Sequence, residues 1–287
     1  MKTIKGTFRE LLSHTLFPLI LFGNISILVF SIINNADLES IFAYLLIGNI
    51  VVMFFLEKAL VFKREWNMSF IEFIRDIGYF SFNGLIDALV KIGLGYLVIS
   101  YASPTQSLPI ALGATLAILI AEFFGYWYHR LGHTNHFLWK IHSIHHVPNK
   151  VNLLNNNTAN FLNIAFGGIV KLFPLILLGF SKEAVFIATS LTTIHSYVVH
   201  VNADIKGGWL GKLFFTPEHH RLHHSTIVDE AKNFAVLITF WDYVFGTYVY
   251  KRGMIPKNIG VDHPESYPKP NQVIKGLLFP FTKKRLW

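Results

Sequence analysis

Histidines dominate the reactive side chains of this sequence. There are 14 histidines in 287 residues, and 12 of them lie between positions 129 and 224. His129 and His133 form an H-x-x-x-H pair, and the segments 142–146 and 220–224 both have the pattern H-x-x-H-H. Because neutral imidazole is a good ligand for iron, zinc or copper, the grouping predicts a metal site.

The spacing within the groups has a geometric meaning. Residues three or four apart lie on one face of a helix, with their Cβ atoms about 5–6 Å apart. Eight imidazoles in three such groups exceed the ligands that one metal can use, which predicts two metals held between converging helix ends. The groups are His129 and His133; His142, His145 and His146; and His220, His223 and His224.

The remaining histidines of this region fit the pattern less well. His195 and His200 are five residues apart, which turns them about 140° from each other on a regular helix. Both could bind a metal only if the helix is distorted, for example by a π-bulge. His219 is an alternative to its neighbour His220, which fits the repeated pattern better. His136 is interpreted as a surface or supporting residue.

The composition indicates that such a site would belong to a membrane protein. Hydrophobic residues make up 52% of the chain and charged residues only 15%, whereas soluble domains carry about 25% charged residues. The absence of cysteine excludes disulfides, iron–sulfur clusters and thiolate metal sites. The net charge of +8 favours anchoring to an anionic membrane surface over binding to nucleic acid, because the basic residues lie mainly between apolar segments.

Four apolar segments are long enough to cross a bilayer, which requires roughly 20 residues of helix. The third contains Asp87 and Lys91, whose spacing puts them on one helix face, where they could pair. Charged residues within a span face protein rather than lipid. The four segments are residues 15–36, 41–62, 78–100 and 107–128.

Beyond residue 150 the pattern changes. Segments 161–180 and 184–201 are apolar but contain Lys171 and two histidines, and we expect a hairpin that dips into the membrane rather than two more spans. Residues 202–287 have mixed polarity. The predicted fold is therefore an all-α integral membrane protein, with about four transmembrane helices, a membrane-dipping hairpin and a cytosolic helical cap that holds a histidine-rich dimetal site.

The positions of lysine and arginine predict the orientation. They occur before the first apolar segment and after the second and fourth, but not in the connections 34–40 and 101–106. The positive-inside rule then places both termini and the histidine groups on the cytoplasmic side. The expected domains are residues 1–121 with the transmembrane helices, 122–250 with the histidines, and a cytosolic tail at 251–287.

Around the histidines the chain resembles the fatty acid hydroxylase/sterol desaturase superfamily, whose members carry an ordered series of a histidine pair and two H-x-x-H-H boxes. The resemblance runs from about residue 122 to residue 248. It includes segment 216–225 around the last box, the element His200-Val-Asn202, and segments 233–235 and 241–247. Residues 1–100 match only in being hydrophobic.

The resemblance implies a fold around two iron ions that use O2 to hydroxylate or desaturate C–H bonds of a membrane lipid, such as a sterol or fatty acyl chain. No His-Pro-Gly-Gly haem motif is present, so electrons are expected from a separate ferredoxin, cytochrome or reductase. The implied metal ligands are His129, His133, His142, His145, His146, His200, His220, His223 and His224, with His195 as a tenth. Candidates for orienting these imidazoles are Asn202, Glu218, Asp229 and Asp242.

Other functions fit the same residues less well. A zinc hydrolase would need an H-E-x-x-H motif or a similar three-ligand site, and that motif is absent. A ferritin-like protein would need Glu-x-x-His pairs on its helices, and none is paired near these groups. The stronger alternative is a histidine-rich membrane metal transporter or metal-binding protein, although transporter ligands normally lie at mid-membrane on broken helices.

Overall fold

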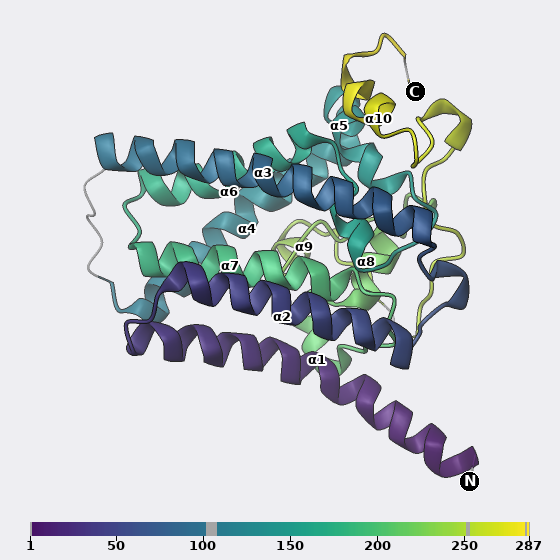
Figure 1. The fold of residues 1–287 in the computed structure, drawn as a ribbon, viewed down its shortest axis with the longest axis horizontal. Coiled ribbons are helices and arrows are strands. Elements are labelled where there is room, and N and C mark those ends of the chain that lie inside the picture. Colours follow the sequence, from purple (N-terminus) through teal and green to yellow (C-terminus); the bar gives the residue numbers. More distant parts are fainter. Residues whose placement is uncertain (1, 102–107, 251–252, 285, 287) are drawn as a thin grey trace.

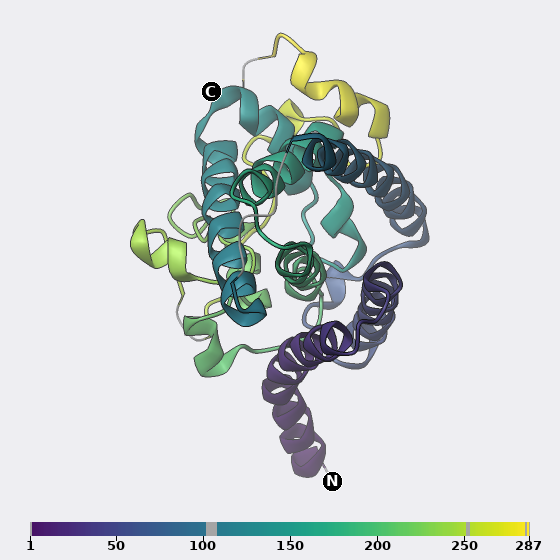
Figure 2. The same ribbon diagram turned by 90° about the vertical axis from the view of Figure 1, so that its left-hand side faces the viewer.

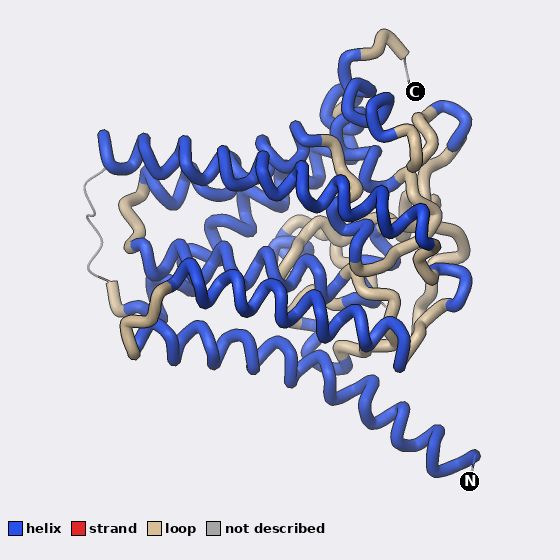
Figure 3. Tube along the Cα trace, in the orientation of Figure 1, coloured by secondary structure: helices blue, strands red, loops and turns tan. Residues whose placement is uncertain are grey.

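The computed structural model describes residues 2–101, 108–250, 253–284 and 286, and within these ranges it is helical, with isolated β-bridges but no strand (Figures 1 and 3). Short 3-10 helices lie at Arg64–Trp66, Leu154–Asn157, Gly208–Lys212, Pro264–Ser266 and Phe279–Phe281. The α-helices are α1 (Lys2–Ile33), α2 (Leu38–Ala59), α3 (Phe70–Tyr101), α4 (Ile110–Thr134), α5 (His136–His146), α6 (Phe161–Leu177), α7 (Lys182–Val199), α8 (Pro217–His223), α9 (Phe240–Val244) and α10 (Val273–Leu278).

Four helices are long and apolar enough to cross a membrane, which confirms the number of predicted spans. The third begins eight residues before the predicted segment, and Asp87 and Lys91 within it form an ion pair of 2.6 Å. The predicted start of the fourth, at residue 107, lies outside the described residues. The four apolar stretches are Thr7–Ile33, Leu38–Ala59, Phe70–Tyr96 and Ile110–Thr134.

In the view along the bundle, α7 lies between α4 on the left and α2 on the right (Figure 2). Helix α4 makes contacts with several neighbours. It packs against α5, α6 and α7, while α3 packs against α6 and α2 against α7. Helix α1 contacts α2 and α7, and its first turns extend beyond the bundle in Figure 1. The helix that carries His129 and His133 is therefore packed against three other helices.

Helices α6 and α7 form the expected hairpin. Their connection lies at the opposite end of the bundle from α5 and α8 (Figure 1), and both helices pack against the span α4. Gly179 adopts the left-handed conformation (φ 70°) that ends α6, a role for which glycine is favoured. Ser181 then caps α7 by accepting a hydrogen bond from the amide of Ala184 at 3.2 Å.

Loops and short helices gather at the end of the bundle where α5, α8 and α10 lie (Figure 3). The two ends of the chain point to this same end in Figure 1. The described residues after position 202 form only short helices between loops, so the expected helical cap is mostly irregular backbone there. This end of the molecule contains the histidines.

Candidate metal centre

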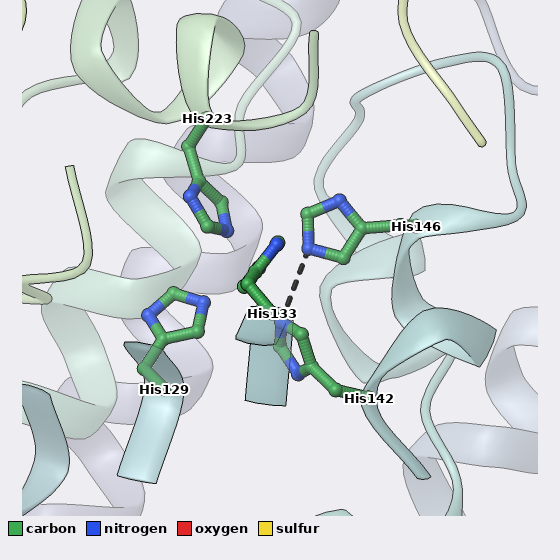
Figure 4. Close-up of side chains that lie close together, drawn as sticks. All are labelled: His129, His133, His142, His146 and His223. Atoms are coloured by element: carbon green, nitrogen blue, oxygen red, sulfur yellow. Dashed lines mark hydrogen bonds between the residues drawn. The ribbon is translucent and has the colours of Figure 1, made fainter. Parts of the chain in front are cut away.

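The structure brings nine histidines together in two neighbouring groups. Within each group, one ring nitrogen of every histidine lies within 4.8 Å of the others. The first histidine group, shown in Figure 4, is His129, His133, His142, His146 and His223. The second histidine group is His145, His200, His220 and His224.

Each H-x-x-H-H motif contributes to both groups, which differs from the prediction that its three histidines project together. In α5, His142 and His146 join the first group, whereas His145 joins the second. In α8 and the residue after it, the assignment is reversed, because His223 joins the first group. The rings of His146 and His224 stack at 4.3 Å between centroids, so the two groups are adjacent.

Four of the nine imidazoles are oriented through Nδ1 by an oxygen atom. A carbonyl or amide oxygen only accepts hydrogen bonds, so Nδ1 carries the proton in each case and Nε2 keeps its lone pair. The four contacts are His129 to the Phe234 carbonyl at 2.8 Å, His142 to the Asn163 side chain at 3.2 Å, His200 to the Asn152 carbonyl at 2.7 Å and His223 to the Lys232 carbonyl at 3.1 Å.

The other ring nitrogens meet inside the two groups. Nε2 of His129, His133, His200 and His223 is buried and has no hydrogen-bond partner in the described part of the chain. Nε2 of His142 lies 3.1 Å from Nε2 of His146, and the same distance separates the Nε2 atoms of His220 and His224. Buried polar atoms without partners are costly. Lone pairs that converge in this way fit a first-row transition metal in each group.

Burial keeps these imidazoles in the form that binds metal. Loss of contact with water, with a smaller contribution from the nearby His129, lowers the pKa of His142 to about 3. Burial likewise lowers the pKa of His200 to about 4. Both rings are therefore neutral near pH 7, which is the protonation state that a metal ligand requires.

A tight junction between α4 and α5 brings the first two histidine motifs together. Asn135 separates the helices, and its side-chain oxygen accepts hydrogen bonds from the amides of Phe137 and Leu138 at 3.0 and 3.1 Å. This is the N-cap interaction that starts a helix. Gly132 permits the close approach, because a Cβ atom at this position would lie 3.3 Å from Cβ of His142.

The start of α8 fixes the last motif. Thr216 precedes the helix, and Nδ1 of His219 accepts a hydrogen bond from the Thr216 amide at 3.1 Å and lies 2.7 Å from its hydroxyl. His219 therefore closes a capping box and is not a member of either histidine group. His220 takes its place among the candidate ligands, as the repeated pattern favoured.

Two buried carboxyl groups organise the backbone that holds the imidazoles. Asp242 accepts hydrogen bonds from the amides of Phe234 and Ala235 at 2.8 and 3.0 Å and from the Thr247 hydroxyl at 2.7 Å. Burial raises the pKa of Asp242, while these three donors oppose that shift by favouring the ionised form. Because the Phe234 carbonyl orients His129, Asp242 supports the first histidine group through the backbone.

The second carboxyl group is Glu57, near the end of α2. Its Oε1 accepts hydrogen bonds from the amides of Leu153 and Asn202, both at 2.7 Å. Leu153 directly follows Asn152, and Asn202 lies two residues after His200. Glu57 therefore binds both segments that form the contact between the Asn152 carbonyl and His200. A membrane helix is thereby joined to the loops of the second histidine group, a role that the position of Glu57 in an apolar segment did not reveal.

Several proposed site residues lie elsewhere. Nε2 of His195 is 2.6 Å from the carbonyl oxygen of Phe215, outside both groups. Helix α7 ends at Val199 without the distortion that would bring His195 and His200 together, so we remove His195 from the ligand set. His136, the first residue of α5, also lies outside both groups.

Three of the four residues expected to orient imidazoles do not contact the histidine groups. Asn202 bonds to the backbone of Lys63 at 3.1 and 3.0 Å. Glu218 accepts from the Gly207 amide at 3.0 Å. Asp229 pairs with Lys232 at 3.3 Å and its side chain is 92% exposed. Only Asp242 acts on the site, and it does so indirectly. The orienting side chain that the sequence did not reveal is Asn163.

A cavity of about 540 Å³ adjoins both histidine groups. Its volume is in the range of ligand-binding pockets. Phe42 and Leu46 of the span α2 form an apolar part of the wall, and Asn156 and Ser196 contribute polar groups. The histidines that reach the cavity are His129, His142, His145 and His220. The arrangement can place an amphipathic molecule beside the nitrogen atoms that converge on the two groups.

Known proteins resemble this chain in the same region. The fatty acid hydroxylase family matches residues 114–247. Ornithine lipid hydroxylase OlsE of Rhizobium tropici is 26% identical over 250 residues, which are 82% of this chain and 75% of that protein. No solved structure matches the chain significantly.

Two other groups of relatives match a smaller part. Human alkylglycerol monooxygenase is 28% identical over 167 residues, which are 55% of this chain and 35% of that protein. A very-long-chain aldehyde decarbonylase of Oryza sativa subsp. indica is 28% identical over 170 residues, which are 53% of this chain and 27% of that protein. The chain thus spans about a third or less of the length of these larger relatives.

Proposed function

Residues 114–247 of this chain belong to the fatty acid hydroxylase family, and we propose that the protein is an O2-dependent, di-iron membrane enzyme that hydroxylates a C–H bond of a lipid. One oxygen atom of O2 enters the C–H bond and the other leaves as water, with two electrons supplied by a separate ferredoxin, cytochrome or reductase and two protons taken from water. Relatives named as a lipid hydroxylase and a monooxygenase support this reaction class.

The observation that carries the proposal is the position of two groups of neutral imidazoles beside a cavity walled by membrane helices. Bound iron supplies the reactivity toward O2 and the C–H bond, which no amino-acid side chain can provide. The first iron would be held by the first histidine group and the second by the second histidine group. His195 has no role in this assignment.

The chain itself contributes orientation and shielding. The carbonyl oxygens of Asn152, Lys232 and Phe234 fix the protonation of Nδ1 in three ligands and hold the rings in place. Helices α2, α3, α4, α6 and α7 line the cavity, and their apolar side chains would replace water around the reacting carbon. A lipid substrate would enter from the bilayer between these helices.

The proposed arrangement in the cell follows from the same helices. Four spans make the protein multi-pass, and the basic residues between them favour a cytoplasmic site and cytoplasmic termini. The division proposed from the sequence, with domains at residues 1–121, 122–250 and 251–287, is kept as part of this proposal. A metal transporter is less well supported, because α5 and α8, which carry five of the nine candidate ligands, lie at one end of the bundle near the loops.

Metal content and iron spectroscopy test the proposal on protein purified in detergent after expression with iron. We expect about two irons per chain, and an oxidised lipid that depends on O2 and reductant. The variant His145→Ala/His223→Ala removes one ligand from each group and should lose both iron and product. His263→Ala is the matched control, since the side chain of this histidine is 84% exposed and lies outside both histidine groups.

Folded wild-type protein with one metal or none would contradict the di-iron assignment. Metal flux in vesicles, without an oxidised lipid, would support the transporter instead.

A further inference from the structure

Lys171 of α6 places a positive charge in the wall of the cavity. Its aliphatic stem lies over Gly125 of α4, where a Cβ atom would be 3.3 Å from Cδ of Lys171. Gly125 is one helical turn before His129 on the same helix. The lysine is therefore close to the first histidine group, and its positive charge is near enough to act on the His129 ring electrostatically.

The neighbouring carboxylates are engaged with other groups. Glu122 lies in α4, and its Oε2 accepts hydrogen bonds from the amides of Val236 and Leu237 at 3.1 and 2.9 Å. Asp87 forms its ion pair with Lys91 at 2.6 Å. Both carboxylates interact electrostatically with Lys171. Among the described residues, however, no carboxylate oxygen lies within 4.0 Å of the Lys171 ammonium group, the limit for an ion pair.

An ammonium group in such a position is costly to bury. A charge removed from water is unfavourable unless a counter-ion or hydrogen-bond acceptors compensate it, and the cost is greater within a membrane protein. The cavity that Lys171 lines also has polar side chains in its wall, among them Asn163, Thr193 and Ser196. An anionic group of a ligand would complete the pairing of Lys171 at this place.

We propose that Lys171 binds the oxyanion of the substrate's headgroup, a carboxylate or a phosphate, so that the headgroup occupies the polar part of the cavity. This proposal deepens and rests on the proposed lipid hydroxylase function. Since Lys171 lies near the first histidine group, the oxidised carbon is close to the headgroup rather than at the far end of an acyl chain. Neutral sterols and hydrocarbons are disfavoured as substrates.

Binding of lipids to the purified, iron-loaded protein in dodecyl maltoside micelles tests this inference without measuring turnover. Three probes with matched acyl chains are compared: phosphatidylglycerol for a phosphate, an N-acyl glycine for a carboxylate, and diacylglycerol as the neutral lipid. In Lys171→Met we expect one or both anionic lipids to bind about 10- to 100-fold more weakly, because a charge-assisted hydrogen bond is lost. Diacylglycerol binding should not change.

Two further variants separate charge from structure. Lys171→Arg should retain anionic lipid binding, because the positive charge is kept. Lys182→Met is the matched control, since Lys182 is exposed at the start of α7, and it should behave as wild type. Loss restricted to phosphatidylglycerol identifies a phosphate headgroup, and loss restricted to N-acyl glycine identifies a carboxylate.

The inference is overturned if Lys171→Met binds all three lipids as wild type does, or weakens all three equally. In the first case Lys171 has no ligand, and in the second it only supports the shape of the cavity. Neither result affects the hydroxylase proposal, which depends on the iron content of the wild-type protein. Conversely, suppose that the wild-type protein holds no iron while Lys171→Met selectively loses the binding of anionic lipid. That result would support the headgroup site and contradict the oxygenase proposal.

Discussion

Helix α2 and the segment around Asp242 differ in what surrounds their side chains. Only 11% of the apolar stretch of α2 is buried within the protein, and residues such as Tyr44 (73% exposed) and Phe55 (65% exposed) face outward. Asp242 and His223, in contrast, are fully buried. Polar contact between α1 and α2 includes one reciprocal pair of amides, Asn24 and Asn49, at 2.7 and 3.0 Å.

Helices in these two regions are held in position by different interactions. In a bilayer, α1 and α2 are positioned mainly by their apolar length and by close packing, so many apolar sequences would serve. The region from α4 to residue 248 is fixed by hydrogen bonds between particular atoms, with little tolerance for change. Substitutions should therefore have large effects in the second region and small effects in the first.

The largest effect is expected for Asp242→Ala, which removes the acceptor of three hydrogen bonds. Leaving buried donors without a partner should cost about 3–5 kcal/mol. We expect a marked fall of the thermal midpoint in detergent and loss of iron. The control is Asp229→Ala, since the Asp229 side chain is 92% exposed, and its midpoint should equal that of wild type. Equal effects of the two substitutions would refute the role given to Asp242.

The second largest effect is expected from acid, which should destabilise the region from α4 to residue 248. The pKa values of His142 and His200 in the folded protein, about 3 and about 4, are below the ordinary value of 6.5. Because the unfolded chain binds these protons first, their contribution to stability is complete above pH 6.5 and is lost as pH falls toward the lowered values. In that interval, each of the two histidines lowers the free energy of unfolding by about 1.4 kcal/mol for every pH unit of acidification.

Hydrogen exchange on metal-free protein can check the acid effect. Between pH 7 and pH 5, protection should fall in α5 and α8 before it falls in α1 and α2. Uniform loss of protection along the chain would contradict the difference between the two regions.

A smaller effect is expected for Gly132→Ala. The new Cβ would lie 3.3 Å from Cβ and Cγ of His142, whose ring is held by Asn163 and His146. Crowding of this kind costs about 1–3 kcal/mol, against a gain of about 1 kcal/mol in helix propensity. Iron should be bound more weakly, as a metal titration would show.

Gly48→Ala is the matched control for Gly132→Ala. No described atom would lie within 4 Å of a Cβ at position 48 of α2, so this variant should bind iron like wild type and be equally or slightly more stable. Weaker iron binding by Gly48→Ala would show that α2 is fixed more tightly than its exposure indicates.

The smallest effect is expected for Phe55→Leu in α2, because this side chain faces outward. The midpoint should change by the equivalent of less than about 0.5 kcal/mol. Phe234→Leu should cost more, since Phe234 is buried and its ring lies 5.4 to 5.9 Å from those of His129, His133 and His223. Thermal unfolding of both variants measures the contrast, and a reversed order would contradict it.

The sequence could predict the spans and the gathering of histidines for different physical reasons. A span depends on the sum of many apolar side chains, which composition reports directly. A histidine group depends on residue type and on spacing along a helix, both of which are visible in H-x-x-H-H. The pairing of Asp87 with Lys91 followed from the same spacing rule and is confirmed.

The division of each motif between two groups could not be predicted, because it depends on how α5 and α8 face each other. The partners of Nδ1 were equally hidden, since three are backbone carbonyls and every residue has one. Asp229 and Asp242 show the limit for side chains: they are the same residue type, but one is exposed and the other buried. Only the path of the loops separates them.

The cavity walls formed by α2, α3 and α4 have a consequence for kinetics. If the proposed lipid substrate enters from the bilayer, the concentration that determines the rate is its mole fraction among the surrounding lipids. Turnover should then fall when inert lipid dilutes the substrate at constant total substrate, and should be insensitive to the volume of buffer. Rates from different preparations can be compared only at equal lipid composition.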